Sequence, residues 1–90
     1  MPKVKFTSAL KRFFPKLTES EVQGHTVSQV IDQINKKYPG IINYILDDNG
    51  NLREHVNIFL RGEVIGDRND LTDPVEKGDE LIFFQALSGG

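Results

Sequence analysis

The sequence has no cysteine. That absence excludes disulfide bridges, thiolate metal sites and cysteine nucleophiles together. There is also no stretch close to the roughly 20 apolar residues that a membrane-spanning helix needs. The opening Met-Pro-Lys-Val-Lys-Phe lacks the uninterrupted apolar region of a signal peptide. We therefore expect a cytoplasmic protein with no membrane segment.

Groups that could perform catalysis are scarce. His25 and His55 are the only histidines, one just before an expected helix cap and one just before an expected strand, so both are interpreted as boundary residues. No glycine-rich phosphate loop is present. The segment 47–51 resembles a calcium loop, but Leu52 stands where the glycine belongs and Ile58 where the bidentate glutamate belongs. We expect neither a metal site nor a cofactor bound by the chain itself.

Charge is unevenly distributed, although the net charge is only −2. A negative balance argues against general nucleic-acid binding. The basic residues that precede the first acid, Glu19, are Lys3, Lys5, Lys11, Arg12 and Lys16. The acids of the last third are Glu63, Asp67, Asp70, Asp73, Glu76, Asp79 and Glu80. The fold either brings these two blocks together or shows two faces of opposite sign, and the sequence leaves both arrangements open.

Two aromatic residues, Phe13 and Phe14, interrupt the basic block. Lysines on phosphates with aromatic rings stacked on bases would suit single-stranded nucleic acid. A domain of this size needs its large apolar side chains for its core, however. We therefore expect both phenylalanines, together with Leu10, to be buried, and we expect no nucleic-acid partner.

Hydrophobic periodicity predicts one main helix and several strands. Thr26 is a good N-cap, and the apolar positions from Val27 to Tyr38 recur at helical spacing until Pro39-Gly40 ends the pattern. Period-two alternation predicts strands elsewhere, and the run Leu81–Phe84 is apolar enough to require a central strand. The expected segments are a strand at 3–7, a loop at 8–17, strands at 19–23, 55–61 and 63–65, a short helix at 41–46, a turn at 47–51, and an acidic connection anchored by Leu71 and Val75.

This order suits an α+β fold in which one amphipathic helix covers one face of a sheet. The simplest solution is a β-grasp (ubiquitin-like) roll, with a mixed sheet of four to five strands, one main helix and a short second helix. The first and last strands would lie parallel at the centre of the sheet. We expect the domain to occupy residues 1–86 and a flexible tail to occupy residues 87–90.

Strand alternation also predicts an apolar surface. If Leu81 and Phe83 face the helix, then Ile82 and Phe84 face outward, and the same rule turns Phe59 outward on the neighbouring strand. Leu87 would extend this cluster toward the tail. An exposed aromatic cluster of this kind is typical of a protein-docking surface.

The sequence ends in Ser88-Gly89-Gly90. Paired glycines make a thin chain that can enter a narrow slot in another protein, but a frayed terminus has the same composition. Composition alone leaves both interpretations open.

The order of short motifs resembles a known family over nearly the whole chain. The matching segments are Lys3-Val4-Lys5-Phe6, Leu10-Lys11-Arg12-Phe13, Gly24-His25-Thr26-Val27, Lys37-Tyr38-Pro39-Gly40, Val56-Asn57-Ile58-Phe59, Gly62-Glu63, Leu71-Thr72-Asp73-Pro74-Val75, Lys77-Gly78-Asp79-Glu80-Leu81 and Gly89-Gly90. In these features the chain resembles the MoaD/ThiS family of ubiquitin-like sulfur carrier proteins. The Asp-Asn-Gly segment is most similar to the MoaD-like and CysO-like branch.

The resemblance implies a function for the tail. In that family an E1-like (MoeB/ThiF-type) adenylating enzyme uses ATP to activate the C-terminal glycine carboxylate, and a sulfur donor then converts it to a thiocarboxylate. A sulfur-accepting synthase of cofactor or amino-acid biosynthesis, such as that of molybdopterin or cysteine, takes the sulfur. The resemblance thus assigns Gly90 as the modified residue, Ser88 and Gly89 as the threaded tail, and the outward cluster as the docking surface.

On this interpretation the chain is a carrier and a substrate of its activating enzyme, not an enzyme. Two alternatives remain: a ubiquitin-like modifier joined to other proteins through Gly90, and a β-grasp binding module that makes no use of the tail.

Overall fold

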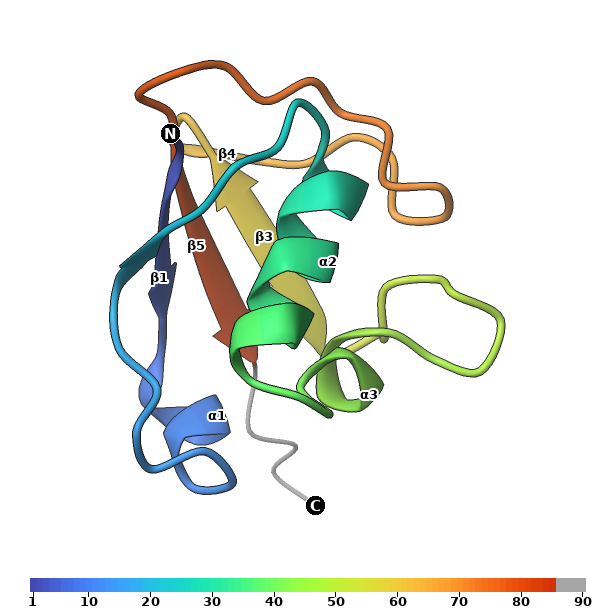
Figure 1. The fold of residues 1–90 in the computed structure, drawn as a ribbon. Helices are drawn as coiled ribbons and strands as arrows, with labels where there is room; N and C mark the ends of the chain where they lie inside the picture. The colour runs from blue at the N-terminus through green and yellow to red at the C-terminus, as the bar shows by residue number, and fades with distance from the viewer. Residues whose placement is uncertain (86–90) are drawn as a thin grey trace.

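The computed structural model describes residues 1–85 of the chain. The elements in chain order are β1 (Lys3–Phe6), α1 (Ser8–Lys11), β2 (Ser20–Glu21), α2 (Val27–Lys37), α3 (Ile42–Ile45), β3 (Val56–Leu60), β4 (Glu63–Val64) and β5 (Glu80–Gln85). Figure 1 shows a sheet with α2 lying across one face and with α1 and α3 at one end of the domain.

The strands form one mixed sheet in the order β2-β1-β5-β3-β4. β1 and β5 run parallel at its centre, and β3 runs antiparallel to β5. Leu81 and Phe83 of β5 are fully buried beneath the helix side, together with Val4 of β1 and Ile58 of β3. The most apolar run is therefore hydrogen-bonded on both edges, as its composition requires. The predicted β-grasp roll and its central strand pair are confirmed.

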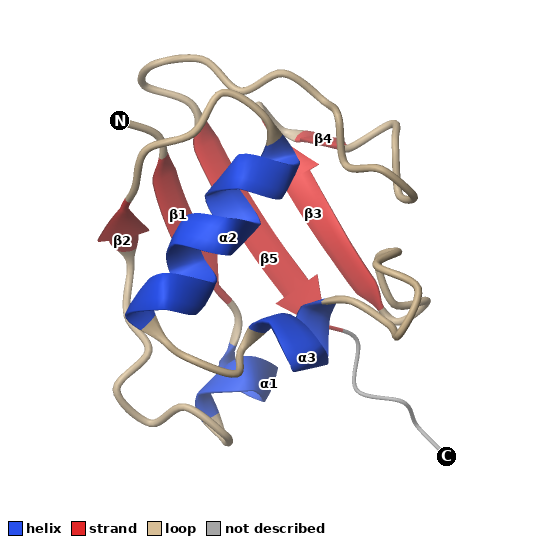
Figure 2. Cartoon of the chain, turned by 45° about the vertical axis from the view of Figure 1, so that its right-hand side comes forward, coloured by secondary structure: helices blue, strands red, loops and turns tan. Residues whose placement is uncertain are grey.

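α2 begins and faces the sheet as its sequence predicts (Figure 2). The Oγ1 of Thr26 accepts a hydrogen bond from the backbone N–H of Gln29 at 3.2 Å, which caps the first turn. The apolar stripe of the helix, buried against the sheet, consists of Val27, Val30, Ile31 and Ile34. Burial of four branched side chains along one stripe fixes the helix on this face.

The segment 8–17, expected to be a loop, contains the four-residue helix α1. Leu10 is fully buried, as predicted, and Phe14 packs partly against the core. The prediction that Phe13 is buried is wrong, because 56% of this residue is exposed. The short helix turns Leu10 inward, and the Phe13 ring instead stacks on Tyr44 with the ring centroids 4.8 Å apart. The helix itself ends before Pro15, which has no N–H to continue it.

The other segments follow the predicted order with small changes of length. The strand expected at 19–23 has only the two residues Ser20–Glu21, and the strand expected at 55–61 is β3. The short helix α3 lies within the predicted 41–46, and Leu71 and Val75 are buried anchors of the connection to β5.

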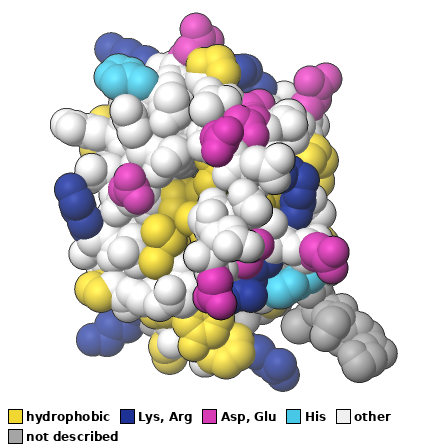
Figure 3. All heavy atoms as spheres, turned by 90° about the vertical axis from the view of Figure 1, so that its right-hand side faces the viewer, with side chains coloured by type: hydrophobic (Ala, Val, Ile, Leu, Met, Phe, Trp, Pro, Cys, Tyr) yellow, Lys and Arg dark blue, Asp and Glu magenta, His cyan; other side chains and the backbone are white. Residues whose placement is uncertain are grey.

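Two lysines of the basic block form ion pairs along the sheet, one of them with the acidic block. Lys3 Nζ lies 3.3 Å from Glu19 Oε1, and Lys5 Nζ lies 3.4 Å from Glu80 Oε2. The second contact joins β1 to its parallel neighbour β5. Figure 3, which faces the side that carries the long loops, shows further acidic side chains scattered over that surface. Within residues 1–85, no helix is long and apolar enough to cross a membrane.

The loop 66–73 holds the start of α2. The carbonyl oxygens of Leu71 and Asp73 accept hydrogen bonds from the backbone N–H groups of Ser28 and Val27, at 3.0 and 3.1 Å. The loop is itself organised by Asp67, whose carboxylate accepts hydrogen bonds from the Thr72 hydroxyl at 2.6 Å and from backbone N–H groups of the loop. These bonds, the Thr72 hydroxyl above all, lower the pKa of Asp67 from 3.8 to about 2.

The lowered pKa of Asp67 predicts a pH-dependent stability. A carboxylate whose pKa is lower in the folded state stabilises the fold above its ordinary pKa, and this contribution is lost as the pH falls through the folded value. Asp67→Asn should therefore be less stable than the wild type at pH 7, with the difference shrinking between pH 3.8 and about 2. Urea unfolding across this range measures it, and Asp48→Asn, in an exposed turn, is the matched control. A difference independent of pH would contradict the assignment.

Candidate functional site

An apolar surface lies on the face of the sheet opposite α2. Phe59 of β3 and Ile82 of β5 are directly opposite each other in the antiparallel ladder. Phe84 follows on the same face of β5, and 41% of this residue is exposed. Phe59 and Ile82 are partly exposed beside it. The predicted outward direction of all three side chains is confirmed, because the alternate residues of both strands are buried.

The sequence interpretation missed a fourth member of this surface, Val64. It is the partner of Phe59 in the β3–β4 ladder, and 49% of it is exposed. The sequence signal was Gly62, which stands between the expected strands 55–61 and 63–65. In the structure Arg61 and Gly62 form the turn and adopt φ values of 53° and 82°. Two successive residues with positive φ make a tight hairpin, and its register places Val64 opposite Phe59. We call Phe59, Val64, Ile82 and Phe84 the sheet-face patch.

Charged and polar groups border the sheet-face patch. Lys5 lies opposite Ile82 on β1 and is held toward Glu80. On the other side of β5, Asn57 lies opposite Phe84, and its Oδ1 accepts a hydrogen bond from Arg68 Nη1 at 2.8 Å. An apolar centre with a polar border is the usual composition of a protein–protein contact surface.

The end of β5 is anchored beside the start of α1. The backbone N–H of Thr7 donates to the carbonyl of Phe83 at 3.2 Å, and the N–H of Gln85 donates to Thr7 Oγ1 at 3.5 Å. Gln85 also pairs with Val56 of β3. Its side-chain oxygen is buried, with no hydrogen-bond partner within residues 1–85. The last described residue of the strand is thus fixed on both sides, one position after the sheet-face patch.

The residues assigned to the tail chemistry, Gly90, Gly89 and Ser88, lie outside the described residues, as does Leu87. Their roles, and the expected boundary between a domain at 1–86 and a tail at 87–90, stay predictions.

The backbone of His25 and the turn 47–51 are held by local hydrogen bonds. The backbone of His25 bonds at both ends, its N–H to Gln29 Oε1 at 2.8 Å and its carbonyl to the N–H of Val75 at 2.9 Å. His55 is exposed at the turn before β3. The carboxylate of Asp47 accepts hydrogen bonds from the N–H groups of Asn49 and Asn51, which makes 47–51 an Asx turn. Within residues 1–85, no group of three or more His, Asp or Glu side chains is arranged to hold a metal ion.

Comparison with protein families gives a match over nearly the whole chain. The model of the ThiS family matches residues 4–90. The chain is also similar to small archaeal modifier protein 1 of Haloferax volcanii, with 31% identity over 65 residues, which cover 72% of this chain and 70% of that protein.

Solved structures share the fold. A chain in the crystal structure of the Amycolatopsis orientalis BexX/CysO complex superposes with a TM-score of 0.85 at 24% identity, covering 100% of both chains. Crystalline SAMP1 from Haloferax volcanii gives a TM-score of 0.78 at 27% identity, covering 99% of this chain and 98% of that one. The crystal structure of Mycobacterium tuberculosis CysO gives a TM-score of 0.83 at 22% identity, covering 97% of this chain and 100% of that one.

Proposed function

The chain belongs to the ThiS family of ubiquitin-like sulfur carriers, and we propose that it carries sulfur as a thiocarboxylate on Gly90. The observation that carries the proposal is the extent of the family match, which runs from residue 4 to residue 90 and so includes the Gly89-Gly90 pair. A carrier of this kind works inside the cytoplasm as a substrate of other proteins, and its own chain performs no catalysis.

The proposed chemistry explains why a partner enzyme is needed. A carboxylate is a poor acyl donor because its oxygen is a poor leaving group. Attack of the Gly90 carboxylate on the α-phosphate of ATP gives an acyl-adenylate and releases pyrophosphate. Hydrosulfide from a sulfur donor then attacks the carbonyl carbon, AMP leaves, and loss of a proton gives the thiocarboxylate. An E1-like activating enzyme supplies the phosphate-binding groups and the donors that stabilise the oxyanion, and a sulfur-accepting synthase takes the product.

The position of the sheet-face patch supports this assignment. Five fully extended residues, the number from 86 to 90, would span at most about 18 Å. The site that activates Gly90 must therefore lie within that distance of Gln85, the last residue that β5 anchors. Phe84 is the residue immediately before this anchor and is exposed on the sheet face. An enzyme that surrounds the tail is thus close enough to cover the patch.

The test of the proposed function uses the intact mass of the purified chain. Incubation with the activating enzyme, ATP and a sulfur donor should replace one oxygen by sulfur, and peptide mapping should locate this change on Gly90. Omission of ATP should abolish it. A chain that binds the enzyme but gains no sulfur under these conditions would refute the carrier assignment.

A second candidate function is conjugation to other proteins. It is favoured by the relative from Haloferax volcanii, which is named a modifier protein. In this case the activated Gly90 carbonyl would be transferred to a lysine amine of a target protein, forming an isopeptide bond. Conjugates that survive denaturation and contain a Gly90–lysine linkage would support this function in place of sulfur transfer, or beside it.

The sheet-face patch gives a separate prediction for binding of the activating enzyme. Phe84→Lys should raise the dissociation constant about thirtyfold, since loss of a central aromatic contact costs about 2 kcal/mol. The change should leave the fold intact because 41% of Phe84 is exposed. Isothermal titration calorimetry measures the binding, and Asn49→Lys, which adds the same charge to the exposed turn 47–51, is the control. Equal affinity for Phe84→Lys and wild type would exclude the patch from the interface.

A further inference from the structure

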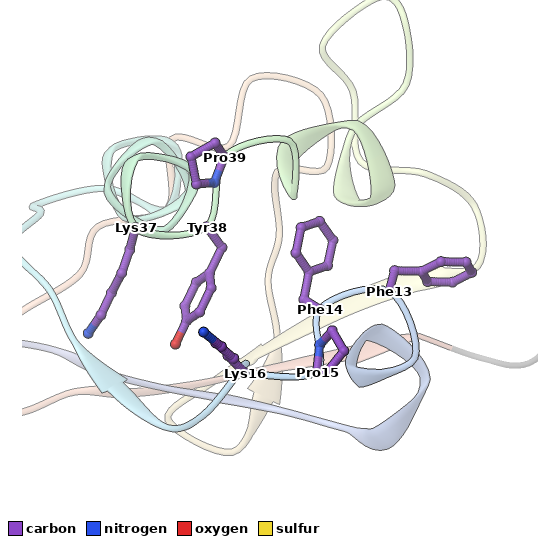
Figure 4. Close-up of a pocket in the computed structure, with 7 residues that line it drawn as sticks. All are labelled: Phe13, Phe14, Pro15, Lys16, Lys37, Tyr38 and Pro39. Carbon is purple, nitrogen blue, oxygen red and sulfur yellow. The ribbon is translucent and has the colours of Figure 1, made fainter.

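A concave surface, distinct from the sheet-face patch, lies on the helix side of the sheet. The segment 13–16, just after α1, and the segment 37–39, at the end of α2, enclose a groove of about 350 Å³. Figure 4 shows the Tyr38 ring and the Phe14 ring pointing into the space between these segments. The groove is separated from the sheet-face patch by the sheet itself, so a partner on one surface leaves the other open.

The groove walls are held in place by contacts within the domain. The Phe14 ring packs edge-on against Tyr44, with ring centroids 5.4 Å apart, and the Phe14 carbonyl accepts a hydrogen bond from the N–H of Leu17 at 2.9 Å. Opposite, the Tyr38 hydroxyl accepts a hydrogen bond from the N–H of Thr18 at 3.4 Å. A surface already ordered before binding loses little conformational entropy when a ligand occupies it.

The rim of the groove is positively charged. Lys16 and Lys37 line it, both exposed. The stretches 11–16 and 33–41 contain five cations, Lys11, Arg12, Lys16, Lys36 and Lys37, and no acid. Within residues 1–85 none of these five forms an ion pair. In Figure 3 the end of the molecule that carries α1 and α3 shows hydrophobic side chains gathered between Lys or Arg side chains.

We propose that this groove binds an acidic segment of a partner protein. One aromatic or branched aliphatic side chain of that segment lies between Phe14 and Tyr38, and flanking carboxylates pair with Lys16 and Lys37. Aromatic and proline walls suit such an apolar anchor, and the uncompensated cations suit the acids. The proposal does not depend on the chemistry of Gly90.

A protein segment fits the groove better than a nucleic acid does. The exposed Phe13 ring is already stacked on Tyr44, with an angle of 25° between the planes, so one of its faces is not available to a base. The chain has a net charge of −2, and the five cations of the groove end come from two short stretches, 11–16 and 33–41. Single-stranded nucleic acids need a longer basic track with free aromatic faces.

The experiment selects peptides from a random displayed library on the whole chain, with counter-selection against the Lys16→Glu/Lys37→Glu variant. The enriched peptides should combine Asp or Glu with one aromatic or branched aliphatic residue. Fluorescence anisotropy with the strongest synthetic peptide should show affinity about tenfold lower for the double variant. Replacement of the peptide's apolar residue by Ser should lower affinity by a similar factor.

Two controls keep the result specific to the groove. Lys77→Glu reverses one charge on an exposed turn before β5, far from the groove, and should bind the peptide as the wild type does, whereas Lys16→Glu alone should weaken binding. Thermal unfolding should confirm that the exposed Lys16→Glu and Lys37→Glu changes leave the domain folded.

Three results would overturn the proposal. The first is enrichment of peptides without acids, or of peptides that bind the double variant equally well. The second is tighter binding of a short oligothymidylate at Lys16 and Lys37, which would make the groove a nucleic-acid site. The third is self-association of the chain, measured by sedimentation, that Lys16→Glu abolishes, which would make the occupant a second copy.

Discussion

Deletion of Gly90 is expected to reduce formation of the thiocarboxylate at least about a hundredfold. The shortened chain still ends in a glycine, Gly89, so the reacting carboxylate keeps its chemical character. The carboxylate moves closer to the docked domain by the length of one residue, about 3.3 to 3.6 Å in an extended chain. In-line attack needs reacting atoms about 3 to 3.5 Å apart, and a misplacement of about 1 Å can cost a hundredfold in rate. The deletion therefore tests position rather than chemistry.

Two measurements separate this effect from weak binding. Pyrophosphate exchange and intact mass report the chemical step, whereas calorimetry reports association with the activating enzyme. The deletion should leave the dissociation constant within a few-fold of wild type, because the sheet-face patch is unchanged. Lys77→Ala, at an exposed turn near the start of β5, should alter neither the rate of sulfur loading nor the dissociation constant. Undiminished sulfur loading of the shortened chain would show that Gly90 is not the reacting residue.

The sheet could be predicted closely because its signals are local and redundant. Alternation in β3 fixes which side chains are buried, and a one-residue slip would expose Val56, Ile58 and Leu60 together. β5 is so apolar that only a central position suits it. Pairing of these two strands then determines the sheet-face patch, and three of its four members were predicted without coordinates.

The segment between β1 and β2 could not be predicted as well. Phe13 and Phe14 are equivalent in sequence, but the backbone hydrogen bonds from both N–H groups to the carbonyl of Leu10 place one ring outward and one partly inward. No periodic pattern spans so short a helix, and both rings also contact Tyr44 of α3. That contact joins residues about thirty positions apart, so the groove between 13–16 and 37–39 had no signal in the local sequence.

The hydrogen bonds that order the loop 66–73 also could not be predicted from the sequence. Its acids suggested only a charged connection, but Asp67 and Asp73 accept backbone N–H groups within the loop and Leu71 has a φ of 58°. These residues position the carbonyl groups that bond to the first turn of α2. Composition identified Leu71 as an anchor, whereas the hydrogen bonds that order the loop depend on its folded shape.

Phe83→Ala is expected to remove most of the stability of the domain. Phe83 is fully buried in the central strand, and its ring lies 5.5 Å from that of Phe6 on β1. Truncation of a buried phenylalanine costs about 3 to 5 kcal/mol because it loses apolar contacts and leaves a cavity. Domains are stable by only about 5 to 15 kcal/mol, and one of 90 residues is small. The midpoint of urea unfolding should fall sharply, and unfolded chain should be detectable without denaturant.

The neighbouring residue supplies the matched control for that loss. Phe84→Ala removes the same atoms one position along β5, but from the exposed face, and should cost less than about 1 kcal/mol. The same change should still weaken binding of the activating enzyme, whereas Phe83→Ala should weaken it only through the unfolded fraction. If Phe84→Ala proved the more destabilising of the two, the register of β5 would be shifted by one residue. Ile82 and Phe84 would then be core residues, and the apolar surface next to Gln85 would not exist.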